Sequence, residues 1–298
     1  MTSVQANGIT IEVEREGSGD PLLLIMGLGG QLIDWPRGFL DELIGQSFSL
    51  IRFDNRDSGL STEFDGEPLT TAAMARGVLA RGLVKSDYLI EDMAADAADL
   101  LDALEVESAH VVGMSMGGMI AQQLAIDHPA RVRSLTSIMS TTGSRRVGRP
   151  KPGLIRNGVR RPMPTRDNAV EQTVELFRHL TGPTFDESEF RELAAASVER
   201  SFRPAGTARQ TAAILASPDR TSALRQLDVP TLVIHGLLDP LVRPSGGIAT
   251  ARAIPGARLL MFNDMAHDLP PTRWSEMAEE IRRNADRVAV PEARAAAS

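Results

Sequence analysis

The 298-residue sequence contains no cysteine. This absence excludes disulfide bonds, thiolate catalysis, cysteine-ligated zinc fingers and cysteine-bound iron–sulfur clusters. Aromatic residues make up only 4% of the chain, with one tyrosine and two tryptophans, which argues against a stacking surface for sugars or bases. No apolar run is longer than the five residues Leu22–Met26, and a run of that length is far too short to span a bilayer.

Charge and the N-terminal residues narrow the class of partner. The chain has 32 basic and 39 acidic side chains, a formal net charge of −7, which disfavours binding to nucleic acid or to an anionic membrane. The first eight residues have neither the basic nor the apolar part of a signal peptide. We therefore expect a cytoplasmic protein that acts on a small molecule, with its oligomeric state left open.

Short apolar runs alternate with amphipathic segments along most of the chain. Ile9–Glu14 alternates apolar and polar residues as a half-buried strand does. The runs that we interpret as buried strands are Leu22–Met26, Phe48–Phe53, Ala109–Val112, Leu135–Met139, Thr231–Ile234 and Arg258–Phe262. Helical periodicity appears in Leu89–Leu104, behind Ser86 as the expected N-cap, in Met119–Asp127 and in Trp274–Ile281. The pattern predicts an α/β fold with a mostly parallel, doubly wound sheet.

Residues 141–221 interrupt this alternation. Their first part, 145–166, is basic and proline-rich, and the remainder has helical periodicity without a buried-strand run. We interpret 141–221 as a helical cap inserted into a core formed by residues 1–140 and 222–288, and 289–298 as a flexible tail. The basic run is typical of a solvated cap edge, although a protein that binds partners through this edge is an alternative.

The sequence Gly113-Met114-Ser115-Met116-Gly117 lies between an expected strand and an expected helix. A G-x-S-x-G sequence in this context predicts a sharp turn that exposes a nucleophilic serine, with glycines where a side chain would clash with neighbouring backbone. The same turn places Ser115 at the beginning of a helix, where backbone N–H groups are unpaired. A glycine-rich packing turn is the structural alternative.

Serine is a weak nucleophile and needs a base and an acid. Among the five histidines, His267 follows the last expected strand and can reach over the carboxyl edge of the sheet, whereas packing, capping or solvated positions are expected for His110, His128, His179 and His235. Asp239 follows the strand Thr231–Ile234 and gives the chain order Ser, Asp, His that is typical of this type of triad. Asp264 and Asp268 are the alternative acids.

Three further blocks support a family resemblance. Met26–Gly30 is similar to a loop that normally begins with His-Gly, Phe53–Ser61 is similar to a D-x-R-G-x-G-x-S stretch, and Asp228–Gly236 leads to Asp239. Together with Gly113–Gly117, these blocks make the chain resemble an α/β-hydrolase-fold serine hydrolase over nearly its whole length outside the cap and tail. Within that superfamily it is similar to the aclacinomycin methylesterase-like group.

The resemblance implies an oxyanion hole formed by the backbone N–H groups of Leu28 and Met116. Backbone donors do not depend on side-chain identity, so Met26 in place of the usual histidine leaves the hole intact but removes any support that the histidine gives to the loop. Asp54 and Arg56 are expected to tie the loop that contains them to neighbouring backbone rather than to contact substrate.

The function expected from this set of residues is carboxylic ester hydrolysis through an acyl-enzyme, without metal or cofactor, and a methyl ester is a candidate substrate. A carbon–carbon bond hydrolase or a lactonase of the same fold, and a non-catalytic ligand receptor, are the alternatives. The apolar residues of the cap that could line a substrate pocket are Met163, Leu176, Phe177 and Phe202. Packing within the cap explains these four residues equally well.

Overall fold

A computed structural model describes residues 1–68, 84–154 and 162–288. Its centre is an eight-stranded sheet with the order β1-β2-β4-β3-β5-β6-β7-β8. β2 runs antiparallel to both of its neighbours, and β4, β3 and β5 to β8 are parallel to one another. The strands are β1 Thr2–Ala6, β2 Ile9–Gly17, β3 Asp20–Ile25, β4 Phe48–Phe53, β5 Ala109–Met114, β6 Val132–Ile138, β7 Thr231–Gly236 and β8 Arg258–Phe262. The predicted α/β class and mostly parallel sheet are confirmed.

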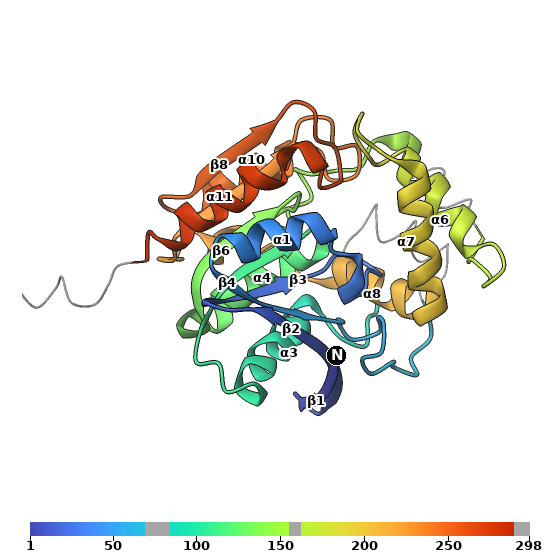
Figure 1. The fold of residues 1–298 in the computed structure, drawn as a ribbon, viewed down its shortest axis with the longest axis horizontal. Helices are drawn as coiled ribbons and strands as arrows, with labels where there is room; N and C mark the ends of the chain where they lie inside the picture. The colour runs from blue at the N-terminus through green and yellow to red at the C-terminus, as the bar shows by residue number, and fades with distance from the viewer. Residues whose placement is uncertain (69–83, 155–161, 289–298) are drawn as a thin grey trace, which may run out of the picture.

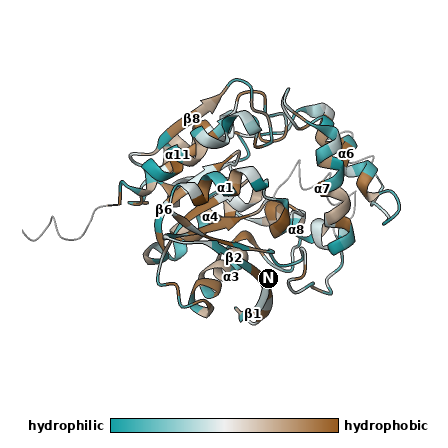
Figure 2. Ribbon diagram, viewed as in Figure 1, coloured by the Kyte–Doolittle hydropathy of each residue, from teal (hydrophilic) through white to brown (hydrophobic). Residues whose placement is uncertain are grey.

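Helices cover both faces of the sheet (Figure 1). One face packs against α3 (Ile90–Ala103), α4 (Met116–Asp127) and α10 (Ser245–Ala253), and the other against α1 (Arg37–Gly45) and α11 (Trp274–Ala285). Figure 2 shows hydrophobic strands at the centre and helices that carry both hydrophobic and hydrophilic residues. The burial of these helix faces against the sheet is the main source of their stability, since isolated helices of this length are marginal in water.

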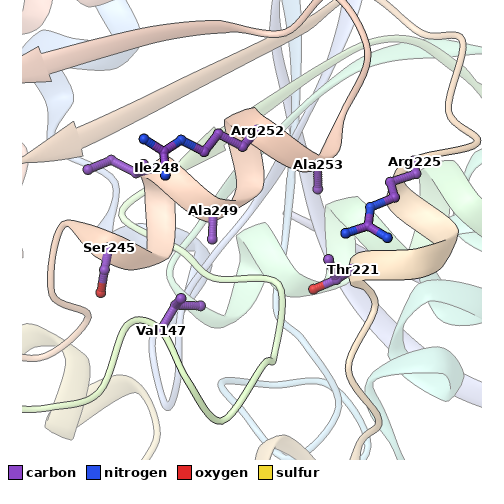
Figure 3. Close-up of a pocket in the computed structure, with 8 residues that line it drawn as sticks. All are labelled: Val147, Thr221, Arg225, Ser245, Ile248, Ala249, Arg252 and Ala253. Atoms are coloured by element: carbon purple, nitrogen blue, oxygen red, sulfur yellow. The ribbon is translucent and has the colours of Figure 1, made fainter.

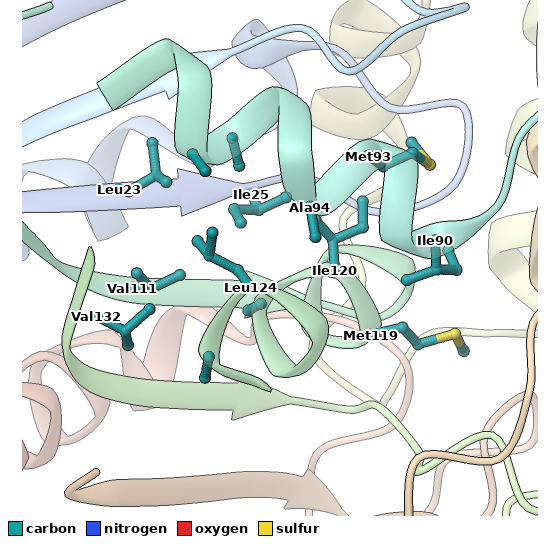
Figure 4. Close-up of a cluster of buried hydrophobic side chains, with 14 of the residues drawn as sticks. Leu23, Ile25, Ile90, Met93, Ala94, Val111, Met119, Ile120, Leu124 and Val132 are labelled. Atoms are coloured by element: carbon teal, nitrogen blue, oxygen red, sulfur yellow. The ribbon is translucent and has the colours of Figure 1, made fainter. Parts of the chain in front are cut away.

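The strand residues alternate between two apolar cores. Leu22 and Leu24 of β3 belong to the core under α1 and α11, whereas Leu23 and Ile25 belong to the core under α3 and α4. All four side chains are completely buried. Figure 4 shows Leu23 and Ile25 facing Ile120 and other side chains of the helices. A strand buried on both faces needs a continuous apolar run, which is why β3 can be predicted from the sequence.

Two local features differ from the sequence-based expectation. β1 was not predicted; it pairs with β2 through a turn in which Asn7 (φ 47°) and Gly8 (φ 73°) are both left-handed, as a type I′ hairpin requires. The expected N-cap at Ser86 is wrong, because α3 has Leu89 in that position. The N–H of Leu89 donates to the Asp92 carboxylate (2.7 Å), so an acidic side chain from the first turn satisfies this donor.

The segment between β6 and β7 contains α6 (Ala169–Arg178), α7 (Glu187–Arg200), α8 (Pro204–Ala216) and the short α9 (Thr221–Leu224). α6 and α7 lie beside one end of the sheet in Figure 1. The buried Ala213 of α8 belongs to the same core as α3 and α4. None of the helices in the described ranges is long and apolar enough to cross a membrane. The predicted flexible tail, 289–298, lies outside the described residues.

The buried His110 on β5 should make the stability of the protein dependent on pH. Burial first, and the positive charge of Arg282 second, lower the pKa of His110 from 6.5 to about 4. Between these values the unfolded chain binds a proton that the folded protein does not, so the free energy of unfolding rises with pH across this window and falls as the pH is lowered. Lowering the His110 pKa from 6.5 to about 4 on folding corresponds to about 3 kcal/mol in the free energy of unfolding, lost once the pH is below both values.

We expect a His110→Asn variant to lose this part of the pH dependence. Urea denaturation of wild type and His110→Asn between about pH 4 and 7 measures the free energy of unfolding of each protein. The difference in pH dependence is due to His110, because the two proteins share all other titrating groups. Free energies of unfolding that change in parallel for the two proteins would show that His110 does not contribute.

Candidate active site

Ser115 lies in the turn between β5 and α4 and has φ 56° and ψ −116°. This is a strained conformation for a residue with a side chain, and the neighbouring glycines make it possible. A Cβ atom on Gly113 would lie 2.1 Å from the Gly117 carbonyl oxygen, and one on Gly117 would lie 2.0 Å from the Ile25 carbonyl oxygen. Only glycine therefore fits at either position of this G-x-S-x-G turn, as the sequence pattern predicts.

His267 lies in the loop after β8, with its imidazole close to the serine. The Nε2 atom is 3.0 Å from Ser115 Oγ. The backbone N–H of His267 donates to the Leu180 carbonyl, which follows α6 (2.8 Å). The imidazole is therefore placed by two segments that are far apart in the sequence, namely the loop after β8 and the segment after α6.

Asp239 lies just after β7 and is almost completely buried. Its Oδ2 atom is 2.8 Å from His267 Nδ1, on the side of the ring opposite Ser115. Its Oδ1 atom accepts the backbone N–H groups of Leu241 (2.8 Å) and Val242 (2.9 Å). These two donors fix the carboxylate so that only Oδ2 faces the imidazole. The structure thus brings Ser115, His267 and Asp239 into one hydrogen-bonded chain.

The two alternative acids bind other groups. Asp264 pairs with Arg273 at 3.0 Å. Asp268 accepts the backbone N–H groups of Ala266 (2.9 Å) and Gly182 (3.1 Å). Burial raises the pKa of Asp268, and these two hydrogen bonds oppose that effect. Asp268 joins the loop that contains His267 to the segment after α6, which is a role in positioning that loop.

The other four histidines have structural surroundings. His235 is completely buried, its Nε2 lies 2.7 Å from the Val242 carbonyl oxygen, and burial lowers its pKa. Because a carbonyl oxygen only accepts, His235 donates from Nε2, which also lies 3.5 Å from Asp239 Oδ2. His110 pairs with Ser134 through Nδ1 (2.8 Å). His128 and His179 are the C-cap residues of α4 and α6, respectively, and His179 is exposed.

The two proposed oxyanion donors belong to segments that adjoin Ser115. Met116 is the first residue of α4. The N–H groups of the first helix turn have no carbonyl acceptor within the helix, so the Met116 N–H is available to a ligand. Leu28 lies in a four-residue turn closed by the Gly30 N–H and the Gly27 carbonyl (3.2 Å), with Gly29 at φ 70° as a type II turn requires. A Cβ on Gly27 would lie 3.3 Å from Ser115 Cβ, so this turn lies directly against the serine.

The Phe53–Ser61 block supports the turn next to it. The Asp54 carboxylate accepts the backbone N–H groups of Leu32 (2.7 Å) and Leu60 (2.8 Å), as expected for a residue that ties loops together. Arg56 has as its main partner the buried Asp96 carboxylate, at 2.6 Å. Sequence reasoning missed the adjacent Asn55, whose side-chain N–H donates to the Met26 carbonyl (3.0 Å).

The four predicted pocket residues have the following surroundings. Met163 and Leu176 are 50% and 40% exposed, respectively. The ring centroid of Phe177 lies 4.4 Å from that of Phe190, which is packing between α6 and α7. The guanidinium of Arg166 lies over the ring of Phe202 at 5.8 Å. The Phe177 contact fits the packing alternative, and a role in substrate binding stays a prediction for all four.

A cavity of about 440 Å³ lies beside α10 and α9 (Figure 3). Ile248 and Ala249 give it an apolar lining, and Arg225 and Arg252 add guanidinium groups. None of the three residues of the hydrogen-bonded chain lines it. Within the described ranges, no cluster of histidine and acidic side chains has the composition of a metal site.

Comparison with known proteins gives consistent similarities. The family described as alpha/beta hydrolase fold matches residues 20–272. Rhodomycin D methylesterase DnrP of Streptomyces peucetius is 32% identical over 293 residues, covering 89% of this chain and 92% of the methylesterase. The 2-hydroxymuconate semialdehyde hydrolase of Pseudomonas sp. strain CF600 is 30% identical over 293 residues, covering 93% and 88%, respectively. The structure of a thermophilic esterase from Thermogutta terrifontis superimposes with a TM-score of 0.71 at 23% identity, covering 97% of this chain and 99% of the esterase.

Proposed function

Because the chain belongs to the alpha/beta hydrolase fold family, we propose that it is a serine hydrolase of carboxylic esters. The observation that carries the proposal is the hydrogen-bonded chain from Ser115 Oγ through the His267 ring to Asp239. A serine, a base and a buried carboxylate in this order are the groups that acyl transfer to serine requires. Residues 141–221 serve in this proposal as the cap over the catalytic groups.

Acylation begins when Ser115 Oγ attacks the ester carbonyl carbon. His267 Nε2 takes the serine proton as the new C–O bond forms, and the Asp239 carboxylate stabilises the imidazolium through Nδ1–H. The tetrahedral intermediate then expels the alcohol, which receives the proton from Nε2. The products of this half-reaction are the free alcohol and an ester between the acyl group and Ser115.

Water completes the reaction by the same steps. His267 removes a proton from a water molecule as its oxygen attacks the acyl carbon, and the proton then passes to Ser115 Oγ as the acyl–serine bond breaks. The carboxylic acid leaves and Ser115 is regenerated. Both tetrahedral intermediates carry an oxyanion, for which we propose the backbone N–H groups of Leu28 and Met116 as donors. Such a donor typically contributes about 2.7–4 kcal/mol to the transition state.

A methyl ester is the substrate class best supported among esters. The support is the similarity over most of both chains to rhodomycin D methylesterases from two Streptomyces strains. A second candidate, carbon–carbon bond hydrolysis, is favoured by the 30% identity to the 2-hydroxymuconate semialdehyde hydrolase. Lactone hydrolysis is a third candidate reaction, because a serine triad opens a cyclic ester by the same acylation step.

A substrate panel combined with covalent trapping tests the proposal. The panel contains methyl, aryl and lactone esters and a vinylogous 1,5-diketone, each measured as kcat/KM. A fluorophosphonate should label the wild-type protein once, at Ser115, as located by peptide mass spectrometry. Ser115→Ala is the control that should remain unlabelled. A wild-type protein that is neither labelled nor active on any substrate would favour the ligand-receptor alternative.

A further inference from the structure

Helix α8 lies directly against the turn that contains Leu28. A Cβ atom on Gly29 would lie 2.9 Å from Thr207 Oγ1, and one on Gly206 would lie 2.2 Å from the Asp57 carbonyl oxygen. Both glycines are therefore sites of close approach between α8 and loops of the core. The contact joins a helix of the predicted cap to the segment that we propose as half of the oxyanion hole.

Gln210 of α8 is completely buried at this contact. Its Oε1 atom accepts the backbone N–H of Gly29 (2.8 Å), and its Nε2 atom donates to the Arg56 carbonyl (2.7 Å). A backbone N–H needs an acceptor and a carbonyl needs a donor, so only this orientation of the amide satisfies both groups. The side chain is thus fixed at both ends and connects the Leu28 turn to the loop that contains Arg56.

The bond to Gly29 fixes the peptide that follows Leu28. In a trans peptide the N–H and C=O groups point in opposite directions, so holding the Gly29 N–H on Gln210 turns the Leu28 carbonyl the other way. The turn is held from its other side by Asn55, which donates to the Met26 carbonyl. With Met26 in place of the usual histidine, these two amide side chains support the loop on either side of Leu28.

We propose that Gln210 is a positioning residue that holds the Leu28 N–H in the geometry of the oxyanion hole. This inference rests on the proposed function. It assigns to a residue of the predicted cap a part in stabilising the transition state, without contact with the substrate. The carboxylate of Asp57 pairs with Arg209 at 2.6 and 2.9 Å, and this buried ion pair anchors α8 independently of Gln210.

Gln210→Met tests the proposal, because methionine has a similar length and shape but cannot bond either backbone group. Removing one oxyanion donor costs about 10²–10³ in kcat, so loosening one donor should lower kcat about 10- to 100-fold. KM for a short p-nitrophenyl ester should change less than about threefold, because the substrate does not touch Gln210. Affinity for a trifluoromethyl ketone, whose adduct with Ser115 carries an oxyanion, should fall in parallel with kcat/KM.

Gln122→Met is the matched control. Gln122 is also completely buried, and its Nε2 donates to Ser137 Oγ (3.0 Å) on β6. It makes no hydrogen bond to the turn at 27–30. The control variant should be destabilised to a similar extent in thermal unfolding but keep its kcat within about twofold of wild type. A loss of kcat in both variants at equal Tm would mean that general loosening of the core explains the result, and would overturn the proposal.

Gln210→Glu is a second variant that keeps the inference testable if Gln210→Met does not fold. A protonated carboxyl can replace the amide at both bonds, whereas a carboxylate would face the Arg56 carbonyl without a proton to donate. The ratio of variant to wild-type kcat should therefore rise as the pH is lowered. A ratio that does not change with pH, or a Gln210→Met variant with wild-type kcat, would overturn the inference. If instead wild type is inactive and is not labelled at Ser115, the proposed function itself fails.

Discussion

Replacing Asp239 with asparagine is expected to lower kcat about 10⁴-fold without unfolding the protein. The reason lies in the two backbone N–H groups of Leu241 and Val242, which both need the Oδ1 acceptor. The asparagine amide must therefore present its NH₂ group to His267 Nδ1. The imidazole then carries its proton on Nε2, where it donates toward Ser115 Oγ and cannot act as a base.

The measurement is kcat with a short p-nitrophenyl ester, together with Tm from circular dichroism. Asp264→Asn is the control, because Asp264 is paired with Arg273 and its loss should leave turnover nearly unchanged. Near-normal turnover in Asp239→Asn would contradict the assignment and would move the role of the acid to Asp264 or Asp268.

Leu28→Pro is expected to lower kcat about 10²–10³-fold, the effect of losing one oxyanion donor. Proline removes the backbone N–H and nothing else that the turn needs. Leu28 occupies the second position of the Gly27–Gly30 turn, and proline is favoured at that position of a type II turn. The side chain of Leu28 is 41% exposed, so its loss should cost little stability.

Leu28→Ala provides the comparison for this prediction, because it shortens the side chain and keeps the N–H. It should retain kcat within a few-fold of wild type, measured with the same ester. Equal activity of the two variants would show that the Leu28 N–H does not bind the oxyanion. A decrease of similar size in both would assign the effect to the side chain.

The central strands β3 to β7 were predictable because nearly all of their residues are buried, and a strand buried on both faces needs a continuous apolar run. Phe48–Phe53 and Arg258–Phe262 were predicted with the boundaries that β4 and β8 have in the structure. β1 was not predicted, since its residues are mostly exposed and carry no such run. The Asn7-Gly8 pair is a known hairpin signal and would have revealed it.

The members of the proposed triad were predictable because the order of the strands dictates where their carboxyl ends lie. Ser115, Asp239 and His267 follow β5, β7 and β8, whose carboxyl ends lie at the same edge of the parallel sheet. Gln210 could not be found in this way. It lies in a helix, its partners are 154 and 181 residues away in the sequence, and helical periodicity says nothing about such contacts.

The N-cap of α3 shows a different limit of sequence reasoning. Serine is a common N-cap residue, but Ser86 instead donates its hydroxyl proton to the Tyr88 carbonyl (2.7 Å). Helix α3 begins only at Ile90, and Leu89 is its N-cap residue. The Leu89 N–H donates to the Asp92 carboxylate. Side chains of the helix itself can replace a capping residue, so composition alone does not locate the boundary.

The hydrogen bond from His267 to Leu180 has a consequence for engineering new specificities. Exchanging the segment between β6 and β7 for that of a relative would change more than the shape of the pocket, because the grafted piece must also supply the carbonyl that accepts the His267 backbone N–H. A chimera without an equivalent of Leu180 would bind new molecules yet convert them slowly. Grafts that carry the 180–182 segment with them should preserve turnover.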